Sequence, residues 1–358
     1  MSTIKDVARL AGVGIGTASR VVSGRGSVAA ATAERVRKAI AELEFRPSHA
    51  ARTLLSGSSQ MIGVYIPVLK GTFYTPILAA IDNELRLGGR HMVVAFGCGD
   101  GDARQQAIEG IGFLLERGCD GLVLMTNVLL EEDIKALGPK QNKVVILNHW
   151  FAGFAEQCFT ADHSLGGVLA AQALLKMQHR KFAVIGGPDN SPDNVARIDG
   201  FMGELVREGI QVSQVVMLKS DFSPEGGWAS ARSLASSGHE FTALFCANDE
   251  MAVGALAYFQ QAGIAVPGMI SVVSYDDTYS AEYSAPQLTS VHIPWRNITF
   301  NGLRWLLNQC YGESLPVQRN FGVSVTWRAS VAVAPTSVTR QLVTRTTKRP
   351  SVARSASN

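Results

Sequence analysis

The chain has 358 residues, of which 46% are apolar and 18% charged. This length fits two or three domains, and the composition excludes global disorder. No apolar run reaches the roughly 18 residues of a transmembrane helix, and the charged first ten residues do not look like a secretory signal. The five cysteines include no CxxC pair, so no zinc site or disulfide framework is indicated. We therefore expect a cytoplasmic protein without metal or cofactor.

The net charge of +3 is unevenly distributed. Residues 1–60 carry nine basic and four acidic side chains, whereas residues 335–358 carry five basic and no acidic ones. The segment between them therefore has an acidic excess. A basic N-terminal region on an acidic body indicates that this region alone binds a polyanion.

Residues 4–46 predict three short helices. The first, "IKDVARLAG", has an apolar face that includes Leu10 and ends at Gly12. The second, "TASRVVSG", ends at Gly24, and the third, "TAERVRKAIAEL", has Thr32 as its predicted N-cap.

The first two helices and the glycines between them predict a helix-turn-helix. Gly12 suits the left-handed conformation that lets the chain reverse. Gly14 and Gly16 lie where the second helix begins. Small residues there let the free N–H groups of the helix approach DNA phosphates closely.

Residues 47–60 read as a connection. Pro47 ends the third helix, and "SHAARTLL" is long enough for only one or two helical turns, which need a partner or ligand to form. The serines and glycine of residues 56–59 indicate a flexible linker.

From residue 61 on, short apolar runs alternate with amphipathic stretches. The strand candidates are "MIGVYIPV", "HMVVAFG", "GLVLMT", "VVILNH", "FAVIGG", "VVML", "ALFCAND" and "ISVVSYDD". The helix candidates include "YTPILAAIDNELRLGG", "ARQQAIEGIGFLLERG", "LGGVLAAQALLKMQ", "NVARIDGFMGELVREGI" and "DEMAVGALAYFQQAGI". This alternation predicts two doubly wound parallel sheets with helices on both faces. Such sheets bind ligands at the carboxyl ends of their strands.

The segments "TIKDVARLAGVGIGTASRVVSG" and "VAAATAERVRKAIAELEFRPSHAARTL" closely resemble the headpiece of the LacI/GalR family of bacterial transcription regulators. The resemblance continues more loosely through residue 334. It implies an all-α helix-turn-helix headpiece and an α/β core like that of periplasmic binding proteins. The implied divisions are a headpiece (1–46), a hinge helix and linker (47–60), an N-terminal subdomain (61–161 plus 292–322), a C-terminal subdomain (162–291 plus 323–334) and a disordered basic tail (335–358).

By this resemblance, the second helix of the headpiece reads DNA. The implied contacts to bases are Ile15, Gly16 and Arg20, and the implied contacts to phosphates are Thr3, Thr17 and Ser19. An arginine can bond guanine bidentately, although Arg20 could also be a solvated surface residue and Thr17 an ordinary helix residue. The family usually has Ser in place of Gly14, so this helix lacks a side-chain cap.

The hinge contacts implied by the family are Ala51, Arg52 and Leu54. A leucine at the last position wedges into the minor groove, with the arginine on a phosphate beside it. Leu54 could instead pack against Leu55 or the partner subunit.

The core is expected to bind a small ligand through eight residues that match the ligand positions of the family: Phe73, Tyr74, Asn148, Arg197, Phe222, Asn248, Asp276 and Trp295. Carboxylate, amide and guanidinium groups suit sugar hydroxyls, and aromatic faces suit a pyranose ring.

Three of these positions keep an alternative reading. Arg197 could form an ion pair with Asp276, Asn248 could cap the following helix, and Phe222 could be a core residue. Asp162 reads as an N-cap or crossover residue, and His163 is open in the same way.

No Walker A, GxSxG or HExxH motif occurs, so we do not expect an enzyme. A periplasmic transport receptor shares the fold but lacks a basic headpiece. The sequence therefore predicts a homodimeric repressor of carbohydrate catabolism or uptake genes, without contact to membranes. A mono- or disaccharide would release it from double-stranded operator DNA. The alternative is a regulator with a purine or sugar phosphate as corepressor.

Overall fold

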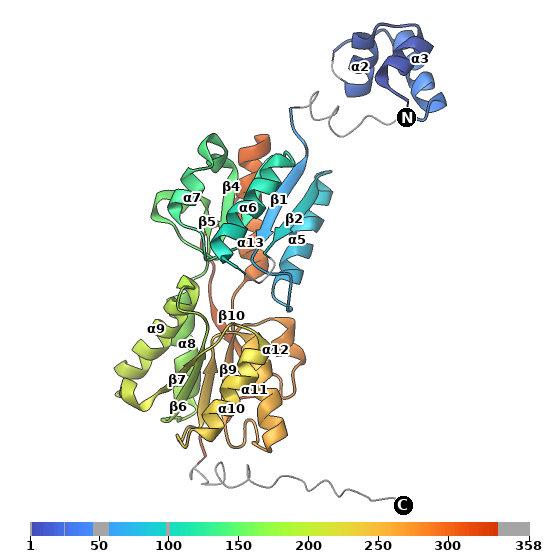
Figure 1. The fold of residues 1–358 in the computed structure, drawn as a ribbon. Coiled ribbons are helices and arrows are strands. Elements are labelled where there is room, and N and C mark those ends of the chain that lie inside the picture. Colours follow the sequence, from blue (N-terminus) through green and yellow to red (C-terminus); the bar gives the residue numbers. More distant parts are fainter. Residues whose placement is uncertain (1, 25, 46–56, 98–100, 336–358) are drawn as a thin grey trace, which may run out of the picture.

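The computed structural model describes residues 2–24, 26–45, 57–97 and 101–335 (Figure 1). The hinge residues Ala51, Arg52 and Leu54 and the predicted tail from residue 336 on lie outside these ranges.

The headpiece consists of helices α1 (Ile4–Ala11), α2 (Ile15–Ser23) and α3 (Ala30–Glu42). Its small core is formed by Val7, Ala8, Ala11, Ala18, Val36 and Ala39. Gly12 and Gly24 adopt left-handed φ angles of 63° and 67° and end α1 and α2, which confirms the predicted turn.

Two details of the headpiece differ from the prediction. Thr32 is not the N-cap of α3, because the helix already starts at Ala30 and the Thr32 amide bonds the Ala29 carbonyl. Leu10 is 46% exposed, since the buried stripe of α1 runs through Val7, Ala8 and Ala11.

The first sheet of the core is entirely parallel. It consists of β1 (Met61–Ile66), β2 (His91–Phe96), β3 (Gly121–Leu124), β4 (Val144–Leu147) and β5 (Cys158–Phe159), in the order β2-β1-β3-β4-β5. Alternate residues of β1 face opposite sides, as the two-residue period of a strand requires. Val64 packs with buried apolar side chains of α5 (Tyr74–Leu87) and α13 (Trp295–Tyr311). Its neighbour Tyr65 packs on the opposite side with those of α6 (Ala103–Glu116).

The second sheet has the order β11-β10-β9-β8-β6-β7. Its strands are β6 (Phe182–Gly186), β7 (Val216–Lys219), β8 (Ala243–Cys246), β9 (Ser271–Asp276), β10 (Thr289–His292) and the antiparallel β11 (Ser324–Thr326). Its helices are α8 (His163–Lys176), α9 (Pro192–Arg207), α10 (Pro224–Ser236), α11 (Asp249–Ala262) and α12 (Tyr279–Tyr283). The short elements α7 (Glu131–Lys135), η1 (Gly138–Lys143), η2 (Ala152–Gln157) and η3 (Val212–Gln214) complete the core.

The predicted fold class is confirmed, and each of the eight predicted strands is present. The sequence did not single out β5, β10 and β11. After β10 the chain returns to the first sheet, where α13 packs against β3, β4 and β5, and then crosses again to β11 (Figure 1). The division of the core by residue number stays a prediction.

The end of the linker is tied to the first sheet by the carboxylate of Asp120. This carboxylate accepts hydrogen bonds from Ser58 Oγ at 2.6 Å, the Ser59 amide at 2.9 Å and the Gln60 amide at 2.8 Å. The Tyr311 hydroxyl of α13 donates a fourth at 3.0 Å. Burial alone would raise the pKa of Asp120, but these hydrogen bonds hold it below its usual value.

Glycines bring α8 and α9 into backbone contact. A Cβ added at Gly200 would lie 2.0 Å from the Ser164 carbonyl oxygen, and one at Gly167 would lie 1.9 Å from that of Arg197. This close packing holds α9, the helix that carries Arg197, directly against α8.

A pair of substitutions in α9 tests this packing. Gly200→Ala should lower the free energy of unfolding by about 1–3 kcal/mol, because the added methyl collides with the backbone of α8. Gly203→Ala is the control: a Cβ there meets nothing within 4 Å, so the better helix propensity of alanine should raise stability by up to about 1 kcal/mol. Urea denaturation measures both. Equal effects would contradict the assigned contact.

Candidate functional site

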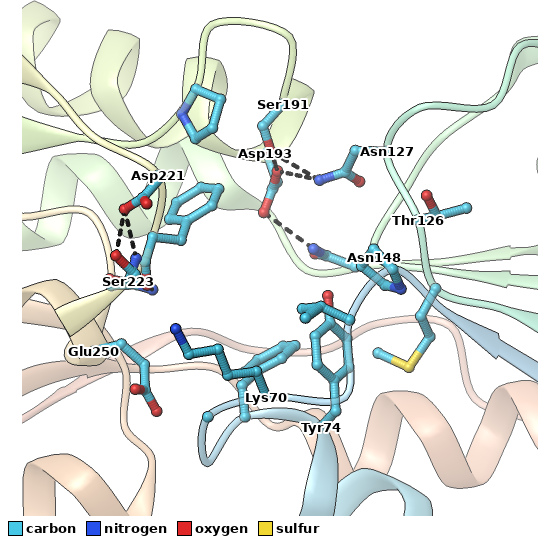
Figure 2. A pocket seen from close by; sticks show the side chains of 18 of the residues that line it. Lys70, Tyr74, Thr126, Asn127, Asn148, Ser191, Asp193, Asp221, Ser223 and Glu250 are labelled. Atoms are coloured by element: carbon cyan, nitrogen blue, oxygen red, sulfur yellow. Dashed lines mark hydrogen bonds between the residues drawn. The ribbon is translucent and has the colours of Figure 1, made fainter. Parts of the chain in front are cut away.

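A cavity of about 530 Å³ lies between the two halves of the core, at the carboxyl ends of their strands (Figure 2). It is lined by seven of the eight predicted ligand residues: Phe73, Tyr74, Asn148, Arg197, Phe222, Asn248 and Asp276. The volume is in the range of sites for small organic ligands.

Trp295 is the eighth predicted residue, and it does not line the cavity. It is 8% exposed and packs edge-on against Phe73, with the ring centroids 5.1 Å apart. Trp295 therefore supports an aromatic wall residue from behind.

Arg197 forms a buried ion pair, but not with Asp276. Its Nη2 bonds Asp193 Oδ2 at 2.6 Å, its Nε bonds the Asp193 carbonyl at 3.2 Å, and its Nη1 bonds the Ala247 carbonyl at 2.5 Å. The guanidinium is 2% exposed and lies 4.2 Å from the centroid of the Tyr275 ring. The alternative that Arg197 pairs with Asp276 is therefore wrong, because its partner is Asp193, one helical turn before the arginine.

Asp193 joins the two halves of the core. Besides Arg197, it accepts hydrogen bonds from Asn127 Nδ2 at 2.8 Å and Asn148 Nδ2 at 3.0 Å, both from loops of the first sheet (Figure 2). Ser191 Oγ donates another at 2.5 Å. Burial would raise the pKa of Asp193, but Arg197 and these donors lower it, so the carboxylate is charged.

Asp276 is a buried polar group of the cavity wall. It is 7% exposed, and its Oδ1 makes no close hydrogen bond with the described residues, although the Trp295 side chain lies near enough to the carboxyl to lower its pKa. Burial raises its pKa to about 7, against the attraction of Arg197. Its φ of 98° is strained for a side chain other than glycine.

The strained loop of Asp276 is held by Asp249 at the start of α11. The buried Asp249 carboxylate accepts hydrogen bonds from Ser274 Oγ at 2.6 Å, Ser290 Oγ at 2.8 Å and the Thr278 amide at 2.7 Å. Burial raises the pKa of Asp249 to about 6. These bonds join β9, the residues just after it and β10 on both sides of Asp276.

Asn248 and Phe222 line the cavity and also take their alternative roles as a helix cap and a core residue, while ligand binding by either stays a prediction. Asn248 caps α11, since its Oδ1 accepts from the Met251 amide at 2.9 Å, while its Nδ2 donates to the Phe222 carbonyl at 3.0 Å. Phe222 packs against the core and also lines the cavity. A Cβ at Gly187 would lie 2.2 Å from the Phe222 ring, so only glycine leaves room for the ring there.

Asp162 and His163 lie at the crossover from β5 to α8. Asp162 caps α8 through the Leu165 amide at 2.8 Å, as one of its two readings had it. His163 bonds Asn148 Oδ1 at 2.7 Å and the Tyr275 hydroxyl at 3.1 Å. Burial lowers its pKa to about 3, so the ring is neutral.

Several wall residues were missed by the sequence analysis. They include Lys70, Asn127, Ser191, Asp193, Asp221 and Glu250. Asn127 and Asp221 follow β3 and β7 closely, so the strand-end rule could have found them. Asp193 carries a weaker signal, its spacing of four residues from Arg197 on one helix.

The headpiece presents the predicted DNA-reading residues on α2. Ile15 is 49% exposed, Gly16 and Arg20 are exposed, and Thr17 and Ser19 are half-buried. Gly14, the N-cap of α2, makes no side-chain cap.

Thr3 has a structural role in the headpiece. Its hydroxyl and amide both donate to Asp6 Oδ2, at 2.7 and 2.9 Å, and form the capping box of α1. Contacts of any of the headpiece residues with DNA stay predictions.

Within the described ranges, no helix is long and apolar enough to span a bilayer. The same residues contain no group of three or more His, Cys, Asp or Glu side chains placed to hold a metal.

Comparison with protein families gives two matches. A model of the lacI family of bacterial regulatory proteins matches residues 3–48, and a model of the periplasmic binding protein-like domain matches residues 171–331. The repressor PurR of Vibrio vulnificus is 32% identical over 310 residues, covering 86% of this chain and 92% of that protein. The ribose operon repressor of Haemophilus influenzae is 31% identical over 297 residues, covering 82% and 87%.

The comparison with solved structures finds regulators of the same family. A LacI-family regulator from Burkholderia phymatum is 51% identical, with a TM-score of 0.74 over 76% of this chain and 99% of that one. The lac repressor dimer bound to operator and the anti-inducer ONPF is 28% identical, with a TM-score of 0.78 over 92% and 99%.

The headpiece and the two-part core define a DNA-binding transcriptional regulator with a small-molecule effector site. The chain belongs to the LacI family of bacterial transcriptional regulators. Its relatives are regulators, not enzymes.

The high pKa of Asp276 makes stability depend on pH. In the folded protein this carboxyl titrates near pH 7, whereas its ordinary value is 3.8. Unfolding between these pH values therefore releases a proton, and raising the pH across this window favours unfolding. Asp276→Asn removes this effect. From pH 5 to pH 8 we expect the wild type to lose about 1–3 kcal/mol of its free energy of unfolding through this carboxyl, a loss that the variant does not share. The difference, variant minus wild type, therefore increases by that amount.

Asp221→Asn provides the control for this measurement. The pKa of Asp221 is lowered, so its carboxylate is charged in both states at pH 5 and pH 8, and the difference from wild type should stay constant. Urea denaturation at the two pH values measures both variants. A constant difference for Asp276→Asn as well would show that Asp276 is ionised throughout.

Proposed function

We propose that the protein is a homodimeric cytoplasmic repressor of carbohydrate catabolism or uptake genes, and that a mono- or disaccharide in the cavity releases it from its operator. The observation that carries the sugar proposal is Asp276, a buried carboxyl of the cavity wall whose Oδ1 makes no close hydrogen bond with the described residues. A buried acceptor of this kind favours ligands that supply a matching hydroxyl. The relative from Haemophilus influenzae is named a ribose operon repressor, which supports this class of effector.

Contacts across the mouth of the cavity give the ligand a means of changing the core. Thr72, before α5, donates its amide and hydroxyl to Glu250 of α11 at 2.8 and 2.5 Å. Lys70 pairs with Glu225 of α10 at 3.4 Å. A ligand that changes these contacts rotates one subdomain against the other, and Asp120 ties the linker to the first of them. A coupling free energy of about 1–3 kcal/mol is enough for 5–150-fold regulation.

Arg20→Ala tests the DNA half of the proposal. We expect the variant to lose about 1–3 kcal/mol of preference for the operator over unrelated DNA, because it loses a bidentate contact to guanine. Sugar binding should not change. Arg37→Ala removes one exposed charge from α3 and serves as the control, with a weaker salt dependence but an intact preference. Fluorescence anisotropy with labelled promoter fragments measures both. Equal preference for operator and unrelated DNA in the wild type would refute the function.

Asp276→Asn tests the effector half. A thermal-shift screen of mono- and disaccharides first identifies a sugar that stabilises the wild type and releases it from promoter DNA. The variant should bind DNA but need at least about tenfold more of this sugar for release, because an amide cannot replace the carboxylate as a double acceptor. Asp199→Asn, an exposed change on α9, should respond like the wild type. Normal release of the Asp276 variant would remove this residue from the site.

A further inference from the structure

We infer that Asp193 makes the cavity selective for uncharged sugars and excludes anionic ones, such as sugar acids and sugar phosphates. The inference rests on the proposed effector site and assigns a specificity-determining residue within it.

Arg197 is the buried cation of the cavity wall, and Asp193 neutralises it. The two side chains are 3% and 7% exposed and lie 2.6 Å apart, so water screens the pair little. Three of the five N–H groups of the guanidinium are bonded to Asp193 and to the Ala247 carbonyl. The remaining two can donate to ligand hydroxyls, but without an uncompensated positive charge.

The other charged wall residues add negative charge. Lys70 is paired with Glu225 at the exposed rim. Asp221 accepts hydrogen bonds from Ser223, and Glu250 accepts them from Thr72, but neither forms an ion pair within the described part of the chain. The Oδ1 of Asp276 makes no close hydrogen bond with the described residues. An anionic ligand would meet the Asp221 and Glu250 carboxylates in the same wall, whereas a neutral hydroxyl can donate to Asp276.

The surroundings of Asp193 show why this one residue decides the preference. Arg197 Nη2, Asn127 Nδ2 and Asn148 Nδ2 all donate to its carboxylate. A smaller neutral residue at position 193 would leave three donors and a buried positive charge converging on one point. That arrangement is an anion-binding site. In the native chain the carboxylate of Asp193 occupies the place that a ligand anion would take.

The test compares full-length wild type with Asp193→Ser and Asp193→Ala by isothermal titration calorimetry. The probes are inorganic phosphate, D-glucuronate and D-glucose 6-phosphate, with D-glucose as the neutral member. We expect both variants to bind at least one anionic probe at least about tenfold more tightly than wild type. The gain should disappear in Asp193→Ser combined with Arg197→Gln, which separates the cavity from the basic headpiece.

Asp221→Asn is the matched control, because it removes the same charge from the same cavity but leaves Arg197 paired. It should gain no anion binding. An equal gain in this variant would show that total charge, and not Asp193, sets the preference. Anion binding by the wild type that Arg197→Gln abolishes would overturn the inference even if the Asp193 variants fail to fold. So would folded Asp193 variants that gain no affinity.

Operator binding of the same samples, with and without each probe, separates this inference from the proposed function. A wild type that excludes anions but binds no promoter DNA would refute the function and leave the charge selectivity intact. A wild type released from its operator by an anionic sugar would keep the regulatory function and refute the role of Asp193.

Discussion

The core depends on one buried ion pair, Asp193 with Arg197. A buried charge without a partner costs several kcal/mol, so each of the two residues is needed to keep the other in place. The pair also gathers neighbours from both halves of the core. Asn127 and Asn148 reach Asp193 from the first sheet, and Arg197 bonds the Ala247 carbonyl at the end of β8. The geometry of the cavity and the contact between the subdomains therefore rest on the same interaction.

The floor of the cavity is stiffened by two acids that point away from it. Asp249 bonds the loop after β9. Asp277 bonds His292 of β10 at 2.9 Å and Thr326 of β11 at 2.8 Å, and it pairs with Arg328 at 2.7 Å. Asp276 stands between these two anchored acids on a strained backbone. Its carboxylate is therefore held toward the cavity before any ligand arrives, so little ordering entropy is lost on binding.

The sequence was sufficient for the parts that depend on local patterns. Glycine conformations predicted the headpiece turns, and apolar runs predicted the longer strands. The two-residue β5 and the three-residue β11 are too short for a period to show. Seven predicted ligand residues meet in one cavity, but the partner of Arg197 was not identified. Asp276 follows a strand and fitted the pattern, whereas Asp193 lies inside the first turn of a helix, where an acid usually only stabilises the helix end. Only the packing of α9 against α8, set by glycines, shows that it faces the cavity.

The attachment of the linker at Asp120 has a mechanical meaning. Three successive residues, Ser58 to Gln60, are clamped to the first sheet, and Gly57 before them has a left-handed φ of 72°. The chain thus has no slack between the clamp and β1. When the first sheet tilts, the point where the linker leaves the core therefore tilts with it.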